Sequence, residues 1–300
     1  MPHELEFVKM HGAGNDFIVM DARADDFPYG DVRKRTAELC HRRTGIGADG
    51  VLMLGRSDIS DYAMHYLNAD GSEAGMCGNG ARCLARFAVM QGFSVNLTFE
   101  VRGTIYRSEV QDDYVSVHFP VDPQPRIITI EDRSWCELNT GTEHVVSIDP
   151  EHAEASEEIF RQTGRRIRNR SDLFPAGTNV NFAHIINENR VNLVTYERGV
   201  EDLTLACGTG AIATAITLKF LNNVGYNPGE SGPFSSAIPD SPVESNSSEP
   251  GETEHHVQVD CPGGPLEVSF KEHRHGKRQQ YLNIILHGPA VTVYHGRIRI

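Results

Sequence analysis

Positively charged residues are scarce in this sequence of 300 residues. It has 28 Lys and Arg against 41 Asp and Glu, a net charge of −13. Because an acidic protein repels phosphate backbones and anionic lipids, and the sequence shows no local basic patch, we expect no nucleic-acid partner and no membrane partner. Long apolar runs are also missing. The longest fairly apolar stretch, residues 203–218, is interrupted by Gly and Thr, and it falls short of the roughly 20 residues that span a bilayer.

The six cysteines include no CxxC pair. This absence argues against a zinc knuckle and against a thioredoxin-type motif, so we expect no metal site. A disulfide framework is not expected in a chain of this size, and a single cysteine is most simply a small buried hydrophobic residue. We predict that role for Cys40, Cys83, Cys136 and Cys261. The first residues include acidic side chains and no apolar run, so we expect no export signal and a cytoplasmic protein.

Hydrophobic periodicity predicts both strands and helices. Apolar residues alternate along 114–119, and the stretches 180–186 and 191–196 flank an Asn-Glu-Asn turn as a hairpin. Residues 81–89 carry apolar side chains at helical spacing, and residues 211–218 are almost entirely apolar. We therefore predict two helices, the second of them enclosed by a sheet.

One segment has a different composition. Residues 222–256 hold five Pro, four Gly, seven Ser and six acidic residues, with no Lys or Arg. Such a composition buries little apolar surface, so it predicts a long, low-complexity acidic surface loop. A partner-binding or regulatory role for this segment is the alternative.

The two predicted helices begin with the same motif. MCGNGA (76–81) and ACGTGA (206–211) both place C-G-x-G-A at a helix start, and GNDF (14–17) faintly matches GTNVNF (177–182). Two topologically similar halves explain this repeat. We predict an α+β fold of two pseudo-symmetric domains, each a curved, barrel-like antiparallel β-sheet around a central α-helix, with the active site in the cleft between them.

A cysteine at a helix start has a distinctive chemistry. The unpaired N–H groups and the partial positive charge of a helix N-terminus attract anions and lower the pKa of a thiol there. The neighbouring glycines let a carboxylate approach those N–H groups, and neither motif has the Lys of a phosphate-binding loop. Two thiols on opposite sides of one carbon can remove a proton from one face and return one to the other. We therefore predict that Cys77 and Cys207 form an acid/base pair for inversion at a carbon centre.

Five motifs carry a resemblance to a known family. They are KMHGAGNDF (9–17), RRTGIGADG (42–50), NADGSEAGMCGNGAR (68–82), GTNVNF (177–182) and YERGVEDLTLACGTGA (196–211). They resemble the diaminopimelate epimerases, which are cofactor-independent amino-acid epimerases with two cysteine acid/base residues. The resemblance runs from Phe7 to about Leu221 and resumes at about Val257.

The resemblance implies a substrate and a set of site residues. The substrate is LL-2,6-diaminoheptanedioate, converted to the meso isomer for lysine and peptidoglycan precursors, with no cofactor. Cys77 and Cys207 match the two thiols, and His144 and Glu197 match a pair that binds the reacting amino group and tunes the thiol pKa values. The residues matching those that hold the rest of the substrate are Asn15, Asn68, Gly78, Asn79, Asn179, Arg198, Gly208 and Thr209.

Two parts of the sequence depart from the pattern of the family. Thr142 and Glu143 stand where many members have Asn-Pro before the histidine, and Gly50 stands where a Gln is common. These departures concern the distal end of the pocket rather than the thiols.

Domain limits and alternatives complete the sequence-based interpretation. We place the first domain at 1–121 with 289–300, where the C-terminal strand returns, and the second at 122–288. A proline or hydroxyproline racemase-like enzyme of the same superfamily is an alternative, although such enzymes typically carry His where Asn79 stands. A non-catalytic thiol protein, either a redox sensor or a metal binder, is another. The expected partner is a small diamino dicarboxylate, and a homodimer is left open.

Overall fold

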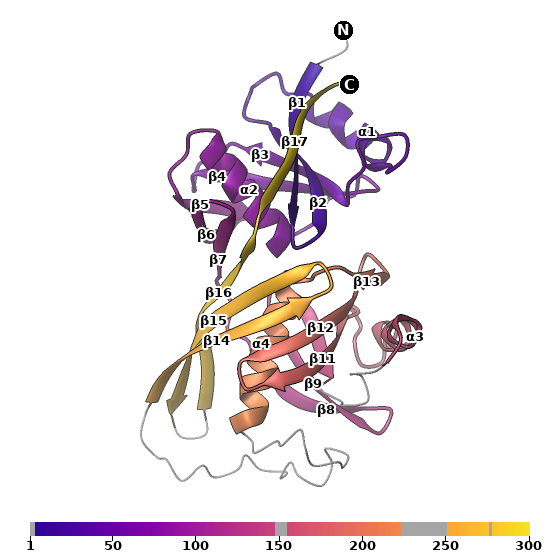
Figure 1. The fold of residues 1–300 in the computed structure, drawn as a ribbon, viewed down its shortest axis with the longest axis vertical. Coiled ribbons are helices and arrows are strands. Elements are labelled where there is room, and N and C mark those ends of the chain that lie inside the picture. Colours follow the sequence, from indigo (N-terminus) through magenta and orange to yellow (C-terminus); the bar gives the residue numbers. More distant parts are fainter. Residues whose placement is uncertain (1–3, 148–154, 224–250, 276–277) are drawn as a thin grey trace. The chain divides into compact units, whose positions relative to one another are not determined.

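The computed structural model describes residues 4–147, 155–223, 251–275 and 278–300. The chain divides into two compact units (Figure 1). Unit 1 comprises Met1–Pro120 and His287–Ile300, and unit 2 comprises Val121–Leu286. No helix in the described part of the chain has the length and apolar character needed to cross a membrane.

Unit 1 alternates strands with two helices. Its elements are β1 (Glu4–Gly12), β2 (Asn15–Asp21), α1 (Tyr29–Cys40), β3 (Gly50–Gly55), β4 (Tyr62–Asn68), α2 (Gly78–Met90), β5 (Asn96–Val101), β6 (Thr104–Gln111), β7 (Tyr114–Phe119) and β17 (Val291–Arg299). The pairs β17–β1, β1–β2, β3–β4, β5–β6 and β6–β7 are antiparallel. The pairs β2–β3 and β4–β5 are parallel, and the helices α1 and α2 make these two crossovers.

Unit 2 repeats this succession. Its elements are β8 (Arg126–Ile130), β9 (Arg133–Asn139), β10 (Glu143–Ser147), α3 (Glu157–Arg168), β11 (Asn179–Asn187), β12 (Arg190–Glu197), β13 (Asp202–Thr204), α4 (Gly208–Asn223), β14 (Gly251–Cys261) and β15 (Gly264–His275); β16 (Arg278–Pro289) begins here and ends in unit 1. The pairs β8–β9, β9–β10, β11–β12 and β14–β15 are antiparallel. The pairs β10–β11 and β12–β14 are parallel, with α3 and α4 between their strands.

The matching orders of pairing show that the two units share one topology. The predicted α+β class with two pseudo-symmetric halves is confirmed, and β17 pairs with β1 as expected for the returning C-terminal strand. Each sheet is mixed rather than wholly antiparallel. The parallel pairs arise because a helix inserted between two strands carries the chain back to the starting edge of the sheet.

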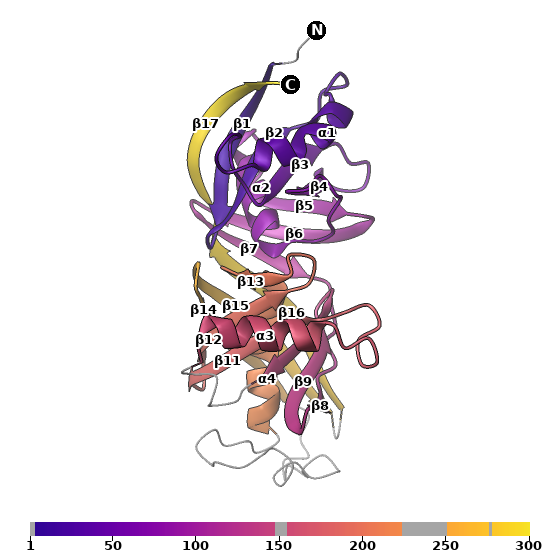
Figure 2. The same cartoon turned by 90° about the vertical axis from the view of Figure 1, so that its right-hand side faces the viewer.

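Each unit buries one helix inside its curved sheet and one outside it. Helix α2 contacts strands β1 to β4 as well as β6 and β7, and α4 contacts β9 to β12 together with β14 and β15 (Figure 1). Helix α3 lies across β11 and β12 (Figure 2), where Phe160 and Ile167 pack in a cluster with Trp135 and Phe182. Helix α1 likewise places Val32 and Leu39 on the outer face of the unit 1 sheet. The prediction that the apolar helix 211–218 is enclosed by strands is confirmed.

Other local predictions are also confirmed. Residues 114–119 form β7, and the hairpin places Asn187 opposite Arg190 across its turn. Burial raises the pKa of the thiol to about 11 in Cys40 and to about 12 in Cys83 and Cys136. These three side chains, together with Cys261, are buried as expected.

The predicted loop 222–256 is too long, and both of its predicted ends are wrong. Asn222 and Asn223 belong to α4, and 251–256 belong to β14, which pairs with β15. The composition of 251–256 concealed this strand because its stability comes from backbone pairing and cross-strand charges rather than from buried apolar side chains. Glu252, for example, lies 2.5 Å from the Lys271 ammonium and 2.8 Å from His273. The remainder of the predicted loop, 224–250, lies outside the described residues.

The buried carboxylate of Glu272 accepts hydrogen bonds from residues on both sides of 224–250. Glu272 on β15 is 1% exposed and accepts hydrogen bonds from Asn223 at the end of α4 and from His255 on β14. Arg274 and Gln279 also donate to it. Burial alone raises the pKa of Glu272, but these hydrogen bonds outweigh burial and lower the pKa to about 2.

Replacing Glu272 is therefore expected to destabilise unit 2 in a pH-dependent way. Because the folded pKa lies below the ordinary 4.5, the contribution is complete above about pH 4.5 and is lost as the pH falls toward 2. We expect Glu272→Gln to cost about 2 to 3 kcal/mol at pH 7 and much less near pH 3. Denaturant titrations at several pH values measure this. The control is Glu267→Gln on the exposed face of the same strand; an equal, pH-independent loss in both variants would contradict the prediction.

Candidate functional site

The first half of the candidate site is the start of α2. Cys77 is the N-cap residue, with extended backbone, and its Sγ accepts a hydrogen bond from the Gly80 N–H at 3.4 Å. Gly78 and Asn79 form the first turn and are buried. The Ala81 N–H closes the turn on the Cys77 carbonyl at 2.8 Å. The thiol therefore lies where the orphan N–H groups and the positive end of the helix dipole act on it.

The second glycine of the motif lets this helix pack closely on the sheet. A Cβ atom on Gly80 would lie 3.1 Å from Leu52 Cδ2 and 3.3 Å from Met64 Cε. In the second half, a Cβ atom on Gly210 would lie 2.5 Å from the Asn181 Oδ1. An added side chain at Gly210 would crowd the Asn181 amide oxygen, and at Gly80 the Leu52 and Met64 side chains would have to shift, so glycine lets both helix starts lie close against side chains of the sheet.

Asn15, the first residue of β2, contacts the first half directly. Its Oδ1 lies 3.8 Å from Cys77 Sγ and 3.4 Å from Asn79 Nδ2, so it accepts from both. Its Nδ2 donates to Asp49 Oδ2 at 2.6 Å. The structure thus brings together three residues predicted from the sequence, and it adds Asp49, which the sequence analysis did not assign.

Charged residues fix Asp49 in turn. Arg42 donates to Asp49 at 2.6 Å and to Asp16 at 2.8 Å, and Lys9 lies 2.5 Å from Asp16. Burial raises the pKa of Asp16, but the hydrogen bonds from Arg42 and Lys9 outweigh burial and lower the pKa to about 2. Asp16 and Asp49 both accept hydrogen bonds from the Arg42 guanidinium, which fixes the Asp49 carboxylate. Because Asn15 donates to Asp49, the Asn15 amide is held in one orientation.

A buried arginine orients Asn79. Arg82 on α2 is 0% exposed, and its Nη2 donates to Asn79 Oδ1 at 2.7 Å. The Asn79 amide nitrogen is thereby directed to Asn15. A large positive side chain under the first turn also adds to the field that favours an anion at this helix start.

Two further positions of the first half lie on the strand pair β3–β4. Asn68 ends β4 and donates to Ser72 Oγ at 3.0 Å. Its register partner is Gly50. A Cβ atom on Gly50 would lie 2.4 Å from the Leu67 carbonyl oxygen, so this chain needs glycine where the family commonly has Gln.

The second half is built on the start of α4. Cys207 precedes the helix, is 6% exposed, and lies with its Sγ 3.6 Å from Thr209 Oγ1. The Ala211 N–H bonds the Cys207 carbonyl at 2.9 Å, as its counterpart does in α2. Thr140 Oγ1 donates to the Thr209 carbonyl at 3.0 Å and fixes the turn. Gly208 is buried and Thr209 completes the first turn.

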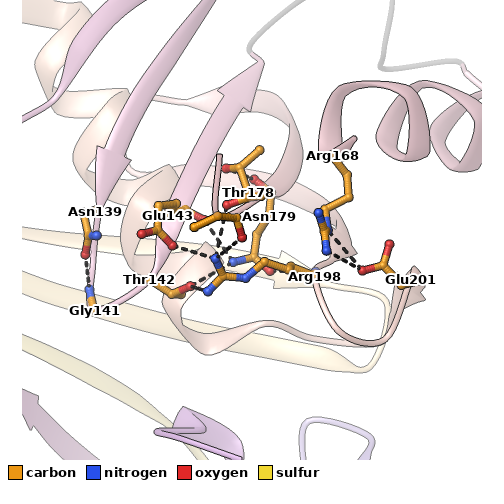
Figure 3. A network of polar contacts seen from close by, with 11 residues as sticks. Asn139, Gly141, Thr142, Glu143, Arg168, Thr178, Asn179, Arg198 and Glu201 are labelled. Carbon is orange, nitrogen blue, oxygen red and sulfur yellow. Dashed lines mark hydrogen bonds and ion pairs between the residues drawn. The ribbon is translucent and has the colours of Figure 1, made fainter. Parts of the chain in front are cut away.

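Arg198 lies at the centre of a polar network beside β10 and β11 (Figure 3). Its guanidinium donates to Glu143 Oε2 at 2.8 Å, to Thr142 Oγ1 at 2.7 Å and to the carbonyls of Ala176 and Gly177. Asn179 receives the Arg198 backbone N–H at 2.9 Å and donates to the Glu143 carbonyl. The Thr142 and Glu143 departures thus act on the arginine that the resemblance assigns to the substrate.

His144 and Glu197 are close to this network along the strands. His144 lies on β10, is 0% exposed, and is the register partner of Asn179 on β11. Burial and the nearby Arg198 charge lower the pKa of His144 to about 3, against an opposing hydrogen bond from Asn181. Glu197 ends β12, directly before Arg198.

The predicted residues therefore fall into two groups, one in each unit. Unit 1 holds Asn15, Asn68, Cys77, Gly78 and Asn79; unit 2 holds His144, Asn179, Glu197, Arg198, Cys207, Gly208 and Thr209. The sequence analysis missed Asp49, Arg82, Glu143 and Asn181 as supporting residues. The sequence contains a signal for Asn181. It lies two residues after Asn179 on the same strand, and residues two apart on a strand share one face.

Comparisons with known proteins show the family of this chain. The family model for diaminopimelate epimerase matches residues 7–122 and 136–228. A diaminopimelate epimerase of Flavobacterium psychrophilum is 34% identical over 97% of this chain and 98% of its own length. One of Parabacteroides distasonis is 31% identical over the whole of both chains.

Solved structures show the same fold at low identity. A PhzF-family phenazine biosynthesis protein of Bacillus anthracis superposes with a TM-score of 0.65 at 12% identity, covering 99% of this chain and all of that one. A hydroxyproline epimerase of Agrobacterium vitis gives 0.63 at 14% identity, over 99% and 91% of the two chains. The sequence matches decide among these groups, and they confirm the resemblance: this chain belongs to the diaminopimelate epimerase family.

Proposed function

We propose that this protein interconverts LL-2,6-diaminoheptanedioate and its meso isomer without a cofactor, with Cys77 and Cys207 as the two acid/base groups. The observation that carries the proposal is the repeated helix start: each unit ends a strand, turns through a cysteine and a glycine, and begins a buried helix. The family of the chain supports the substrate.

The reaction needs one proton removed and one returned. A thiolate takes the α-hydrogen as a proton, so an S–H bond forms, the C–H bond breaks, and the electron pair passes into the substrate carboxylate. The other thiol then gives its proton to the opposite face of the carbon and becomes the thiolate. Backbone N–H groups at the two helix starts stabilise the charged carboxylate, and such preorganised donors contribute strongly to catalysis.

The supporting residues divide between the two ends of the substrate. Asn15, held by Asp49, keeps an acceptor against Cys77 and Asn79. Arg198 provides a planar set of donors suited to a second carboxylate. A reducing compartment keeps both thiols available, so we also propose that the enzyme works in the cytoplasm.

A racemase acting on proline or hydroxyproline is the second candidate. Its support is the fold shared with the hydroxyproline epimerase, which at 14% identity concerns the fold alone. Proline has one carboxylate, so it leaves Arg198 without a ligand. Assays with both substrates separate the two functions.

Each thiol is expected to be essential for turnover. Cys77→Ala and Cys207→Ala should each lower kcat by about 10³-fold or more, because an acid/base group contributes roughly 10²- to 10⁴-fold and inversion requires both. In D₂O the wild-type protein should form meso product with deuterium at the inverted carbon, which mass spectrometry measures. Cys83→Ala, on the same helix as Cys77 but in the core, is the control. Turnover of proline with none of diaminopimelate would overturn the proposal.

The negative charge of Glu143 is expected to weaken the binding of a dicarboxylate substrate, so removing this charge should strengthen binding. Its carboxylate partly neutralises Arg198 and repels a second carboxylate, and such half-exposed pairs are worth about 0 to 1 kcal/mol. We expect Glu143→Gln to lower KM for diaminopimelate by about 3- to 5-fold with kcat nearly unchanged. Glu201→Gln, whose partner is Arg168 rather than Arg198 (Figure 3), should leave KM unchanged. A higher KM in Glu143→Gln would contradict this role.

Asp49 is expected to position Asn15 rather than to touch the substrate. In Asp49→Asn the new amide can turn its nitrogen to Asn15, and Asn15 then loses its fixed orientation. We expect kcat/KM to fall about 10-fold, a loss of about 1.4 kcal/mol in transition-state stabilisation, with little change in thermal stability. Asp58→Asn, an exposed substitution in the same unit, is the control. Unchanged kinetics in Asp49→Asn would show that Asn15 needs no such support.

A further inference from the structure

Two arginines on α2 hold the chain at the point where β16 ends and β17 begins. We call residues 287–290, at this point, the return segment, because β16 carries the chain from unit 2 back into unit 1. Arg82 and Arg86 are four residues apart, so they lie on one face of the helix. Arg82 Nε donates a hydrogen bond to the Pro289 carbonyl at 3.3 Å, and Arg86 donates to the Ala290 carbonyl. The helix therefore binds two successive carbonyl groups of the return segment.

Asp113, in the turn between β6 and β7, completes this attachment. The Ala290 N–H donates to the Asp113 carbonyl at 2.8 Å, and the Asp113 carboxylate forms an ion pair with Arg86. Backbone groups between two strands have no ladder partners, so they need donors and acceptors from elsewhere. Here α2 and the β6–β7 turn supply them, and the return segment is fixed to unit 1.

The Arg82 guanidinium also holds the start of α2. Its Nη2 donates to Asn79 Oδ1 at 2.7 Å, and its Nη1 lies 3.4 Å from the Gly78 carbonyl oxygen. A guanidinium is planar and rigid, so the directions of its N–H groups are fixed relative to one another. The place of the Pro289 carbonyl and the orientation of the Asn79 amide are therefore linked through one side chain.

Close packing leaves this link little freedom. Arg82 is 0% exposed. A Cβ atom on Gly12, at the end of β1, would lie 3.1 Å from the Asn79 carbonyl oxygen. It would also lie 3.3 Å from Arg82 Nη2 and 3.3 Å from the Pro289 carbonyl oxygen. The end of β1, the helix start, the guanidinium and the return segment thus meet at one point, and a displacement of one of them must be shared by the others.

The second helix start has a different residue at the position of this arginine. In the repeated motif, CGNGAR (77–82) corresponds to CGTGAI (207–212), and Ile212 is a buried apolar side chain. The topology gives a reason for the difference, because α2 lies in the unit into which β16 returns. Arg82 therefore belongs to the attachment of the return segment rather than to the repeated helix start.

We infer that Arg82 is a positioning residue, which couples the return segment to the first turn of α2 and thereby sets the orientation of Asn79. The Asn79 Nδ2 lies 3.4 Å from Asn15 Oδ1, and Asn15 Oδ1 lies 3.8 Å from Cys77 Sγ. The position of the return segment thus reaches the first thiol through three side chains. The effect on turnover rests on the proposed function, whereas the coupling itself does not.

A double-mutant cycle tests whether Arg82 acts through Asn79. Arg82→Lys keeps the positive charge but replaces the rigid, planar donors with a single ammonium group. We expect kcat/KM for diaminopimelate to fall about 10-fold in the wild-type background and less than about 2-fold in the Asn79→Ala background, because residues in contact are coupled. Arg107→Lys, at an exposed position on β6, is the control and should leave kcat/KM unchanged. Equal losses from Arg82→Lys in both backgrounds would overturn the inference.

Pro289→Gly tests the return segment without changing the arginine. Glycine frees the backbone at this position, so the carbonyl no longer has a fixed place. We expect kcat/KM to fall about 3-fold, again only while Asn79 is present. This variant tests the coupling even if Arg82→Lys fails to fold. A loss of the same size in the Asn79→Ala background would show that the return segment acts by another route, and it would overturn the coupling.

Nuclear magnetic resonance of the full-length protein measures the coupling without substrate. With ¹⁵N-labelled asparagine, the side-chain amide signal of Asn79 is the one lost in Asn79→Ala. We expect this signal to shift in Arg82→Lys and in Pro289→Gly, and to keep its position in Arg107→Lys. An unchanged Asn79 signal in Pro289→Gly overturns the inference. If the protein fails to turn over diaminopimelate, the proposed function fails, while this spectrum still decides the coupling.

Discussion

The central constraint on each unit is that the polar N-terminus of a helix lies buried within a curved sheet, where its backbone N–H groups need acceptors. The first N–H groups of a helix have no partner within the helix, and burying them without acceptors is costly. In α2 the Cys77 sulfur accepts the Gly80 N–H, and the Cys77 carbonyl accepts the Ala81 N–H. The need to satisfy these groups links the stability of the fold to the carboxylate binding that we propose.

Close packing makes this arrangement possible. Gly80 and Gly210 let the two helix starts lie close against side chains of the sheet, which an added Cβ atom would crowd. The parallel crossovers β4–α2–β5 and β12–α4–β14 then carry each helix back through the interior of its own unit. The same topology in both units explains why one motif occurs twice in the sequence.

Asparagine side chains are the main polar elements of both halves, and each is fixed through its two ends. Asn15 accepts from Cys77 and donates to Asp49; Asn179 accepts from Arg198 and donates to the Glu143 carbonyl; Asn181 accepts from Thr195 and donates to His144. An amide with both ends engaged has one orientation, and it passes that orientation to its neighbours. Glu143 and Thr142 show how the network varies in this chain, because both accept hydrogen bonds from the Arg198 guanidinium.

Features that depend only on neighbouring residues could be predicted from the amino-acid sequence. The cysteine at each helix start, the hairpin 180–196 and the repeat follow from short motifs and from the periods of helix and strand, which are local properties of the chain. The contacts that those motifs make could not be predicted in this way, because they depend on how distant strands pair. Asn15 meets Asp49, and Asn181 meets His144, across strand pairs whose register no short motif encodes. The start of strand β14 escaped detection for the same reason, since residues 251–256, mostly exposed, are held by pairing with β15 rather than by a hydrophobic pattern of their own.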